Sequence, residues 1–297
     1  MEQRNGIVLI NKPEGFTSFD VVAVMRGVLG TKKVGHTGTL DPMATGVLPI
    51  LCGRATGLCD KMPISDKRYT AVMRLGLTTD TLDITGEVTS RNDVFAKEGD
   101  IRALLPEFTG EIEQTPPMYS AVKVGGKKLC DIARSGKTVE RPKRRVTVYS
   151  IKMTAADEKN NEYTLDIRCS KGTYIRSLCD DIGRRLGCGG VLVSLIRSEA
   201  CGFSLDECTN LSAARNMTPD ELIIPVERAL MCYPGIKISS AQTVRFKNGG
   251  ELDLQRTGLK NGYKGSVRVY SPDGIFLGLG KTDAEGLSLK CDLLLEL

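Results

Sequence analysis

Short apolar runs separated by polar turns occupy most of this chain, and two stretches repeat apolar residues at helical spacing. Residues 6–10 form an apolar run that leads to Pro13 and Gly15, which predicts a strand followed by a turn. Ser18 is then placed to cap a helix that stops at Gly30, because apolar positions between them recur at helical intervals. The second helical stretch follows a Lys-Gly-Thr turn, and its apolar stripe comprises Ile175, Leu178, Cys179, Ile182 and Leu186.

Alternating apolar and polar positions predict strands at residues 67–76, 146–151 and 163–169. Asp100 is placed to cap a short helix over residues 101–108. Near residues 233–235 the pattern changes to short strands and glycine turns. About 60 residues follow that boundary, a length that suits a small β-barrel module.

Residues 35–46 form a polar loop that reads Gly-His-Thr-Gly-Thr-Leu-Asp-Pro-Met-Ala-Thr-Gly and holds the only histidine, His36. Its glycines let the backbone approach a ligand closely. Pro42 stiffens the turn that presents the carboxylate of Asp41, because proline restricts the residue before it. The apolar run at residues 47–51 can anchor this loop to a core. The alternative is a surface turn in which Asp41 only caps a helix.

The composition is that of a protein with a sizeable core. With 297 residues, 41% of them hydrophobic, the chain fits one large domain or a large and a small one. No apolar run reaches the ~18 residues of a membrane span, and the polar N-terminus lacks a signal-peptide pattern, so we expect a cytoplasmic protein. The ten cysteines contain no Cys-x-x-Cys pair and are expected to be reduced core thiols. One histidine cannot complete a Cys/His zinc set, and it excludes most Ser-His and Cys-His hydrolases.

Positive charge is concentrated in one segment. Residues 121–152 carry ten basic and two acidic side chains, whereas the net charge of the whole chain is +5. A basic segment on a near-neutral body is typical of a protein that binds a phosphate backbone. Its Gly-Gly and Ser-Gly breaks predict an excursion from the body, with a short helix near residues 128–134. The alternative is a solvated, charged hairpin.

Two further segments add aromatic and cationic groups. Lys67-Arg68-Tyr69 opens a predicted strand, and Tyr174 and Arg176 lie at a strand-to-helix turn. A guanidinium beside a carboxylate orients it and lowers its pKa, and a ring offers a stacking surface for a base taken out of its helix. Each group also has an ordinary explanation. Tyr69 fits a half-buried strand residue, Lys67 and Arg68 fit edge charges, and Arg176 fits a surface ion pair with Asp180 four residues later.

Taken together, these segments resemble the bacterial tRNA pseudouridine-55 synthase family (TruB type). The resemblance extends from Gly6 to about Phe203, and the Gly-His-Thr-Gly-x-Leu-Asp-Pro string is its most specific part. The residues that carry it are 11–15, 35–46, 66–69, 75–81, 117–123 and 169–176. The tail from about Ile236 is similar, more weakly, to the small RNA-binding barrel of the PUA type.

The resemblance implies an α+β pseudouridine synthase fold, with a mixed, mainly antiparallel sheet flanked by helices and a small C-terminal PUA-like β-barrel. The implied domains are a catalytic domain at 1–235, with a basic thumb inserted at about 121–152, and an RNA-binding domain at 236–297. It also implies that the chain isomerises uridine 55 in the T loop of tRNA. No cofactor or metal is needed, because the reaction gains no atoms and involves no redox change. The partner is then the T arm of tRNA, with no membrane and no obligatory protein partner, and the protein is expected to be a monomer.

The resemblance assigns roles to single residues. Asp41 matches the aspartate that attacks the target nucleotide, Tyr69 the ring that stacks on the flipped base, and Arg176 the arginine paired with that aspartate. Further substrate-binding positions are Tyr174, a neighbouring ring; Leu195, whose backbone reads the uracil edge; and His36, which enters the RNA loop. The RNA-binding cations are Lys12, Lys123, Lys127, Lys128, Arg141, Lys143, Arg144 and Arg145.

One strip departs from the family pattern. Where the family commonly has Leu-Arg-Arg-Thr-Arg, this chain has Leu195-Ile196-Arg197-Ser198-Glu199. The change removes two cations and adds an acid. It therefore predicts weaker phosphate contacts and a lower affinity for RNA at this strip.

Two alternatives to a stand-alone synthase follow from the same residues. A guide-RNA-dependent synthase is one, although the resemblance implies that such enzymes lack the thumb. A non-catalytic tRNA-binding chaperone is the other, and the presence of Asp41, Tyr69 and Arg176 together argues against it. The sequence does not decide whether Asp41 attacks the base, attacks the sugar or removes a ribose proton.

Overall fold

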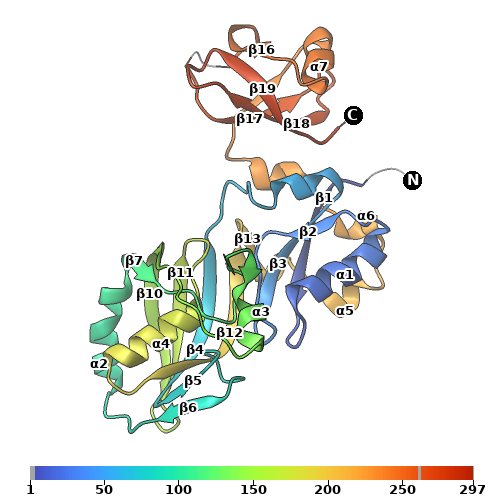
Figure 1. The fold of residues 1–297 in the computed structure, drawn as a ribbon. Coiled ribbons are helices and arrows are strands. Elements are labelled where there is room, and N and C mark those ends of the chain that lie inside the picture. Colours follow the sequence, from blue (N-terminus) through green and yellow to red (C-terminus); the bar gives the residue numbers. More distant parts are fainter. Residues whose placement is uncertain (1–3, 260–261, 297) are drawn as a thin grey trace.

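The computed structural model describes residues 4–259 and 262–296, which form an extended mixed sheet with helices and a smaller C-terminal unit (Figure 1). The large sheet has the strand order β14-β1-β3-β12-β4-β11-β10-β7, with β2 paired to β3 and β13 to β12. Only the β1–β14 and β3–β12 pairs are parallel. The predicted α+β class with a mixed, mainly antiparallel sheet is thus confirmed.

The strands of this sheet are β1 (Gly6–Lys12), β2 (Val34–His36), β3 (Thr45–Cys52), β4 (Lys67–Leu75), β7 (Gly110–Gln114), β10 (Arg144–Asp157), β11 (Glu162–Cys169), β12 (Gly190–Ala200), β13 (Phe203–Ser204) and β14 (Thr209–Asn210). The helices of the body are α1 (Ser18–Leu29), α2 (Glu98–Leu104), α4 (Ile175–Arg185), α5 (Leu211–Ala214) and α6 (Pro219–Leu222). A two-stranded sheet is formed by β5 (Leu77–Thr79) and β6 (Val88–Arg91).

Apolar residues on alternate strand positions build the two halves of the core. Tyr69, Ala71 and Met73 of β4 point toward α4 and pack with its stripe of Ile175, Leu178, Cys179 and Ile182, the stripe that the sequence predicted. In the other half, α1 packs on β1 and β3 through Val21 and Met25. The pocket described below lies where loops from both halves meet at one end of β4 and β12.

Two helix starts differ from the sequence prediction. Thr17, not Ser18, caps α1: its hydroxyl accepts from the Asp20 backbone N–H at 3.1 Å, and the Asp20 carboxylate accepts from the Thr17 N–H at 2.8 Å. Helix α2 starts at Glu98, and Asp100 lies inside its first turn, where it accepts from the Lys97 N–H at 2.8 Å. At α1 these reciprocal bonds form a capping box, whereas at α2 only the Asp100 carboxylate contributes, because a lysine side chain has no acceptor.

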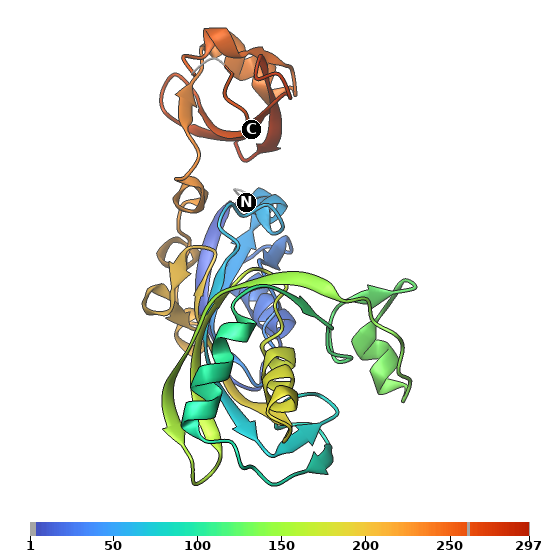
Figure 2. The same ribbon diagram turned by 90° about the vertical axis from the view of Figure 1, so that its left-hand side faces the viewer.

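A projecting segment lies between β7 and β10, and Figure 2 shows it extending away from the body. It contains the hairpin β8 (Lys123–Val124) and β9 (Lys127–Lys128) and the helix α3 (Leu129–Arg134). The excursion ends earlier than the predicted thumb at 121–152. Residues 144–148 already pair with β7 in the large sheet, because they follow the alternation that a strand requires.

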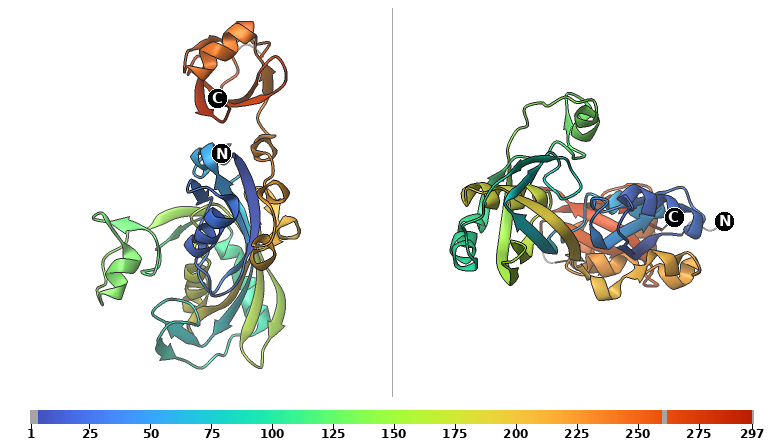
Figure 3. Two further views of the ribbon diagram at one scale, coloured as in Figure 1. Left: turned by 90° about the vertical axis from the view of Figure 1, so that its right-hand side faces the viewer. Right: turned by 90° about the horizontal axis from the view of Figure 1, so that it is seen from below.

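The C-terminal unit is a curled five-stranded sheet in the order β15-β17-β18-β19-β16, together with one helix (Figure 3). Its elements are β15 (Gly235–Lys237), α7 (Ser240–Lys247), β16 (Leu252–Asp253), β17 (Ser266–Tyr270), β18 (Phe276–Thr282) and β19 (Ser288–Leu294). It encloses its own apolar cluster around Phe246 and Val267. Lys61 of the body pairs with Asp292 at 2.7 Å, so the two parts are in direct contact.

Candidate active site

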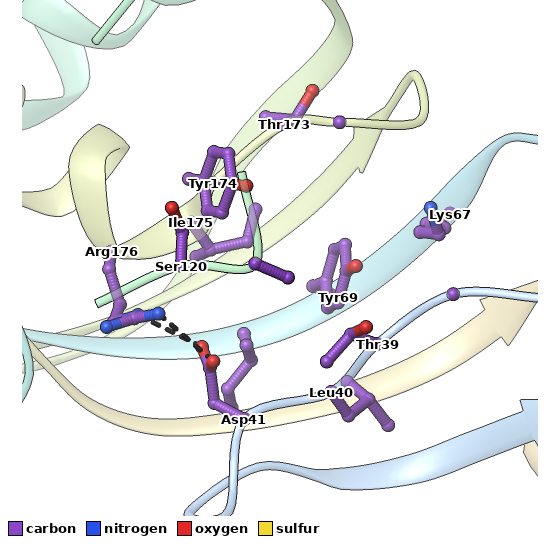
Figure 4. A pocket seen from close by; sticks show the side chains of 14 residues that line it. Thr39, Leu40, Asp41, Lys67, Tyr69, Ser120, Thr173, Tyr174, Ile175 and Arg176 are labelled. Carbon is purple, nitrogen blue, oxygen red and sulfur yellow. Dashed lines mark hydrogen bonds and ion pairs between the residues drawn. The ribbon is translucent and has the colours of Figure 1, made fainter. Parts of the chain in front are cut away.

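A pocket lies at the end of β4 where four separate segments of the chain converge (Figure 4). The polar loop, the start of β4, the base of the projecting segment and the turn into α4 each contribute, and Leu195 of β12 completes the wall. The lining residues are Gly38, Thr39, Leu40, Asp41, Lys67, Tyr69, Ser120, Ala121, Gly172, Thr173, Tyr174, Ile175, Arg176 and Leu195. Of the implied substrate-binding residues, the structure therefore brings together all but His36.

Buried hydrogen bonds fix the loop that carries Asp41. The hydroxyl of Ser18, at the start of α1, accepts from the Leu40 N–H at 2.8 Å and donates to the Leu40 carbonyl at 3.1 Å. Arg197 is fully buried and donates to the carbonyls of Val47 at 2.8 Å and Gly38 at 3.1 Å. Because the carbonyls of Gly38, Thr39 and Leu40 have side-chain donors, these bonds hold the backbone next to Asp41 in one shape.

Gly46 allows this arrangement. It has φ = +108°, and a Cβ at this position would lie 2.2 Å from the Arg197 carbonyl oxygen. β3 and β12 approach there in a short parallel bridge that pairs Gly46 with Arg197. A side chain would force the two strands apart, so glycine is required at the point where β12 supports the loop.

Asp41 and Arg176 form an ion pair on the floor of the pocket (Figure 4). Arg176 Nη2 donates to Asp41 Oδ1 at 3.0 Å, and Nε lies 2.9 Å from Oδ2, off the line of a hydrogen bond. The Arg176 side chain is 5% exposed and that of Asp41 is 33% exposed. The pair is thus anchored on the arginine side and open to a ligand on the aspartate side.

Further contacts hold Arg176 in place. It donates to the Thr81 carbonyl at 3.0 Å and to the Tyr119 carbonyl at 2.8 Å, and Nη1 lies 3.4 Å from Oδ2 of the buried Asp83. The simple surface pair with Asp180 is excluded, because Asp180 pairs with Arg184 at 2.5 Å instead. Arg176 therefore links the catalytic candidate to the base of the projecting segment.

The charge of Asp41 is set by opposing effects. Burial raises the pKa of its carboxyl above the ordinary value, and the Arg176 guanidinium lowers it again, while Asp83 raises it and Lys12 lowers it. The balance leaves the pKa raised. A carboxylate of this kind is more basic than a free aspartate, and this suits either a nucleophile or a base.

Tyr69 and Leu195 stand beside this pair on neighbouring strands. β4 lies between β12 and β11, so it is not an edge strand, and the explanation of Lys67 and Arg68 as edge charges is wrong. Tyr69 is 6% exposed and lines the pocket, and burial raises the pKa of its hydroxyl to about 12. Its ring is neutral at physiological pH and presents a stacking surface.

His36 lies on β2, outside the pocket lining. Among the residues that the structure describes, no hydrogen-bond partner meets its buried Nδ1 atom. Burial, reinforced by the positive charge of Arg197, lowers the pKa of its imidazole. The side chain is therefore a neutral ring at physiological pH.

The structure contradicts the predicted role of Lys12 in RNA binding. It is fully buried, and its Nζ donates to the carbonyls of Pro13 at 2.8 Å, Phe16 at 2.6 Å and Pro42 at 3.3 Å. Burial lowers its pKa to about 8. A buried ammonium that is already hydrogen-bonded cannot reach a phosphate, so Lys12 instead supports the backbone next to Asp41.

The other predicted RNA-binding cations divide into two groups. Lys123, Lys127 and Lys128 are exposed in the hairpin of the projecting segment. The remaining four lie near the β7–β10 pair: Arg141 donates to the Pro116 carbonyl, Lys143 and Arg145 lie near Glu113 and Glu111, and Arg144 is exposed at the start of β10. The first group is free for phosphates, whereas Lys143 and Arg145 already have acidic neighbours.

The two changed positions of the strip that departs from the family pattern, Ile196 and Glu199, lie on the far face of the sheet. Leu195 lines the pocket, and since side chains alternate along a strand, Ile196 points to the opposite face, where it is 40% exposed. Glu199 pairs there with Arg68 at 3.1 Å. Cations at positions 196 and 199 would face away from the pocket, so the structure does not support the predicted loss of phosphate contacts at the pocket.

The sequence reasoning missed the roles of four residues of the site. Asp83 lies in a polar loop that the sequence shows only as turn-forming, and the supporting roles of Ser18 and Arg197 depend on contacts between distant segments. Ser120 was quoted only as part of a motif, yet its buried hydroxyl lines the pocket and lacks a hydrogen-bond partner among the described residues.

In residues 4–259 and 262–296, we find no group of three or more His, Cys, Asp or Glu side chains placed to hold a metal ion. None of the described helices combines the length and the apolar character that crossing a bilayer requires.

Comparisons with known proteins give concordant matches. A family model described as TruB family pseudouridylate synthase (N terminal domain) matches residues 26–175, and one described as Pseudouridine synthase II TruB, C-terminal, matches residues 234–290. The tRNA pseudouridine synthase B of Clostridium kluyveri is 44% identical over 276 residues, which is 93% of this chain and 95% of that protein. The protein of the same name from Bacillus licheniformis is 43% identical and covers 84% of each chain.

Solved structures resemble the chain over nearly its whole length. A chain in a Cbf5-Nop10-Gar1 complex superimposes with a TM-score of 0.71 at 26% identity, covering 97% of this chain and 84% of that one. A chain in an H/ACA RNP bound to a substrate RNA containing 2′-deoxyuridine gives a TM-score of 0.71 at 24% identity and covers 98% and 85%. The second likeness concerns the fold alone.

Proposed function

The chain belongs to the TruB family of pseudouridylate synthases, and from that premise we propose that it isomerises uridine 55 in the T loop of tRNA to pseudouridine. The observation that carries the proposal is the Asp41–Arg176 pair, which faces an open pocket beside the ring of Tyr69. The relatives named tRNA pseudouridine synthase B support the same substrate. The pocket is the place where a uridine taken out of the RNA stack would lie.

The reaction breaks the N1–C1′ bond, turns the base and joins C5 to C1′. A proton leaves C5 and N1 gains one, so the composition of the nucleotide is unchanged. Asp41 supplies the reactive oxygen, as a nucleophile toward base or sugar or as the base for a ribose proton. Arg176 keeps the carboxylate ionised and directed into the pocket. No step requires a group that the chain does not provide.

The other pocket residues hold the base. Tyr69 stacks on the flipped uracil, and Tyr174 borders it from the turn into α4. The backbone of Leu195 meets the uracil edge. His36, a neutral ring outside the pocket, occupies the space that the base leaves in the RNA loop. Flipping costs a few kcal/mol, which these contacts offset.

The surfaces around the pocket bind the T arm. Exposed lysines in the projecting segment meet the phosphate backbone on one side, and the C-terminal unit extends the RNA-binding surface on the other. We assign a catalytic domain to residues 1–235 and an RNA-binding domain to residues 236–297. The enzyme acts in the cytoplasm as a monomer, without an obligatory protein partner.

A T-arm stem-loop transcript tests the function directly. The purified full chain is incubated with the transcript alone, and pseudouridine is located by mass labelling. We expect isomerisation of the single uridine that corresponds to position 55, and none in a transcript with cytidine there. Binding without isomerisation would identify a chaperone. Isomerisation only after addition of a second RNA would identify a guide-dependent enzyme.

A further inference from the structure

Lys67 is a cation in the pocket for which we find no acidic partner among the described residues. It is the first residue of β4 and lines the pocket together with Asp41 and Tyr69. Figure 4 shows the Tyr69 ring between Asp41 on one side and Lys67 on the other. The Lys67 stem packs on Gly38, where a Cβ would lie 3.3 Å from its Cε and 3.5 Å from its Nζ. The ammonium is thus held at one end of the pocket and is not a mobile surface charge.

The carboxylates of the pocket lie at the Asp41 end, where Arg176 and Lys12 oppose their charge. Asp41 and Asp83 place two carboxylates around the single guanidinium of Arg176. At the Lys67 end the charged side chains that act on Lys67 are Arg197 and Lys171, which are also cations. Arg197 is buried, and it donates to carbonyl groups and contacts the Tyr69 hydroxyl, so no described carboxylate accompanies it.

Among the described residues no carboxylate pairs with Lys67, and the groups that favour its charged form are the thiols of Cys201 and Cys169. The Cys169 thiol is uncharged at neutral pH, because burial raises its pKa to about 11. Asp66 pairs with Arg168 at 3.3 Å, and Asp166 pairs with Arg68 at 2.8 Å. Burial, with the positive charges of Arg197 and Lys171, lowers the pKa of Lys67. An unpaired cation in a partly dry site of this kind is stabilised when an anion binds.

We propose that Lys67 binds a phosphate of the RNA backbone next to the flipped uridine and so sets the direction in which that nucleotide enters the pocket. The inference rests on the proposed function and names a further positioning residue for it. With its phosphate at Lys67 and its base against Tyr69, the nucleotide turns its C1′ toward Asp41. An ammonium fits this task, since it is a compact charge with three donors and requires no planar partner.

The competing explanation is structural, with the Lys67 stem only filling space beside Gly38. The two explanations differ in what a neutral phosphate does. In the Asp41→Asn background, which holds the stem-loop unreacted, binding is measured for transcripts that carry a single neutral methylphosphonate at each position around the target uridine. The same series is measured with Lys67→Met, Lys67→Arg and Lys159→Met added.

Phosphate binding by Lys67 predicts coupling at one position. Lys67→Met weakens binding of the unmodified stem-loop about tenfold, the loss expected for one charge-assisted bond. It also lowers the slope of log Kd against log salt by about 0.7 to 0.9. A methylphosphonate at one position weakens RNA binding by the protein that retains Lys67, but it does not further weaken RNA binding by the Lys67→Met variant. Lys67→Arg retains this coupling, and Lys159→Met, in the distant β10–β11 turn, behaves as the parent protein does.

Additive losses at every methylphosphonate position, or an unchanged salt slope for Lys67→Met, would overturn the assignment. If Lys67→Met unfolds, the coupling retained or lost in Lys67→Arg decides the question, because that variant keeps a charge at this position. Turnover of the unmodified stem-loop by the wild-type chain reports the proposed function separately. A failure of the Lys67 assignment therefore leaves the proposed function intact.

Discussion

Arg176 meets Asp41 along one edge of its guanidinium, with Nη2 3.0 Å from Oδ1 and Nε 2.9 Å from Oδ2. The arginine is buried, whereas a third of the aspartate side chain is exposed to the pocket. The pair thus has a fixed half and a reactive half. The free side of the Asp41 carboxylate is the part of the pair that a substrate can reach.

Replacement of Asp41 by Asn keeps the shape of the pocket but removes the reactive charge. We expect pseudouridine formation to fall by at least about a thousandfold, because nucleophile and base are lost together. Stem-loop affinity stays within a few-fold, as the RNA-binding surface is unchanged. Asp166→Asn, on the far face of the sheet, is the matched control and retains activity. Persisting turnover in Asp41→Asn would remove this residue from the mechanism.

Lys12→Met tests the correction of the sequence-based assignment. Since Lys12 is fully buried, its removal leaves the salt slope of RNA binding unchanged, whereas Lys127→Met lowers it. Activity falls, because the carbonyls of Phe16 and Pro42 next to the Asp41 loop lose the Lys12 donor that ties them together, although the Gly15 N–H still donates to Pro42 at 2.8 Å. A reduced salt slope in Lys12→Met, measured by titration at several salt concentrations, would restore the original assignment.

The wild-type protein and the Lys12→Met variant also allow a test of how stability depends on pH. Burial lowers the pKa of Lys12 from its ordinary value of 10.5 to about 8, so between these values the unfolded chain holds a proton that the folded chain has released. The stability of the folded state therefore rises with pH across that interval. Urea unfolding of the wild type and of Lys12→Met should show their difference shifting in favour of the wild type from about pH 8 to 10.5. A constant difference would mean that the pKa of Lys12 is the same in the folded and the unfolded chain.

Gly46→Ala tests the backbone support of the loop. The new methyl group would meet the Arg197 carbonyl oxygen at 2.2 Å from a residue held at φ = +108°. We expect a loss of about 2 kcal/mol or more in the free energy of unfolding, together with lower activity. Gly27→Ala on α1 is the matched control: it meets no atom within 4 Å and should change stability by less than about 1 kcal/mol, in the stabilising direction. Equal effects of the two substitutions, measured by thermal unfolding, would contradict this explanation.

The double variant Ile196→Arg, Glu199→Arg tests which face of β12 meets RNA. The sequence predicts that it strengthens RNA binding, but Ile196 lies on the face opposite Leu195. A bulge between Arg197 and Glu199 turns Glu199 to that same far face, where it pairs with Arg68. We expect affinity and salt slope to remain nearly unchanged. Ala121→Lys, at the pocket wall, adds one cation on the side that faces the RNA and should raise the slope. A higher slope in the double variant would place RNA on the far face.

Periodicity and motif spacing were sufficient to predict the helices and strands around the site and the main chemical groups within it. The apolar stripe of α4 and the alternation along β4 and β11 are local properties, because each element must bury one face. Asp41, Tyr69 and Arg176 were identified from three short segments, and the structure brings all three to one pocket. The exact helix starts were not predicted, because Thr17 and Ser18 are both polar residues that can cap α1, and Asp100 bonds to the Lys97 N–H from inside α2.

What the sequence determined by itself was therefore the class of fold, the family and the residues that can do the chemistry. Only the tertiary structure decided which polar residues are buried. Lys12 and Arg197 look like surface cations in the sequence, yet they are fully buried as donors to loop carbonyls. Ile196 and Glu199 turn away from the pocket, whereas Lys67 faces it. The physical reason is that burial and strand facing depend on contacts between segments far apart in the chain, and a local pattern carries no record of those contacts.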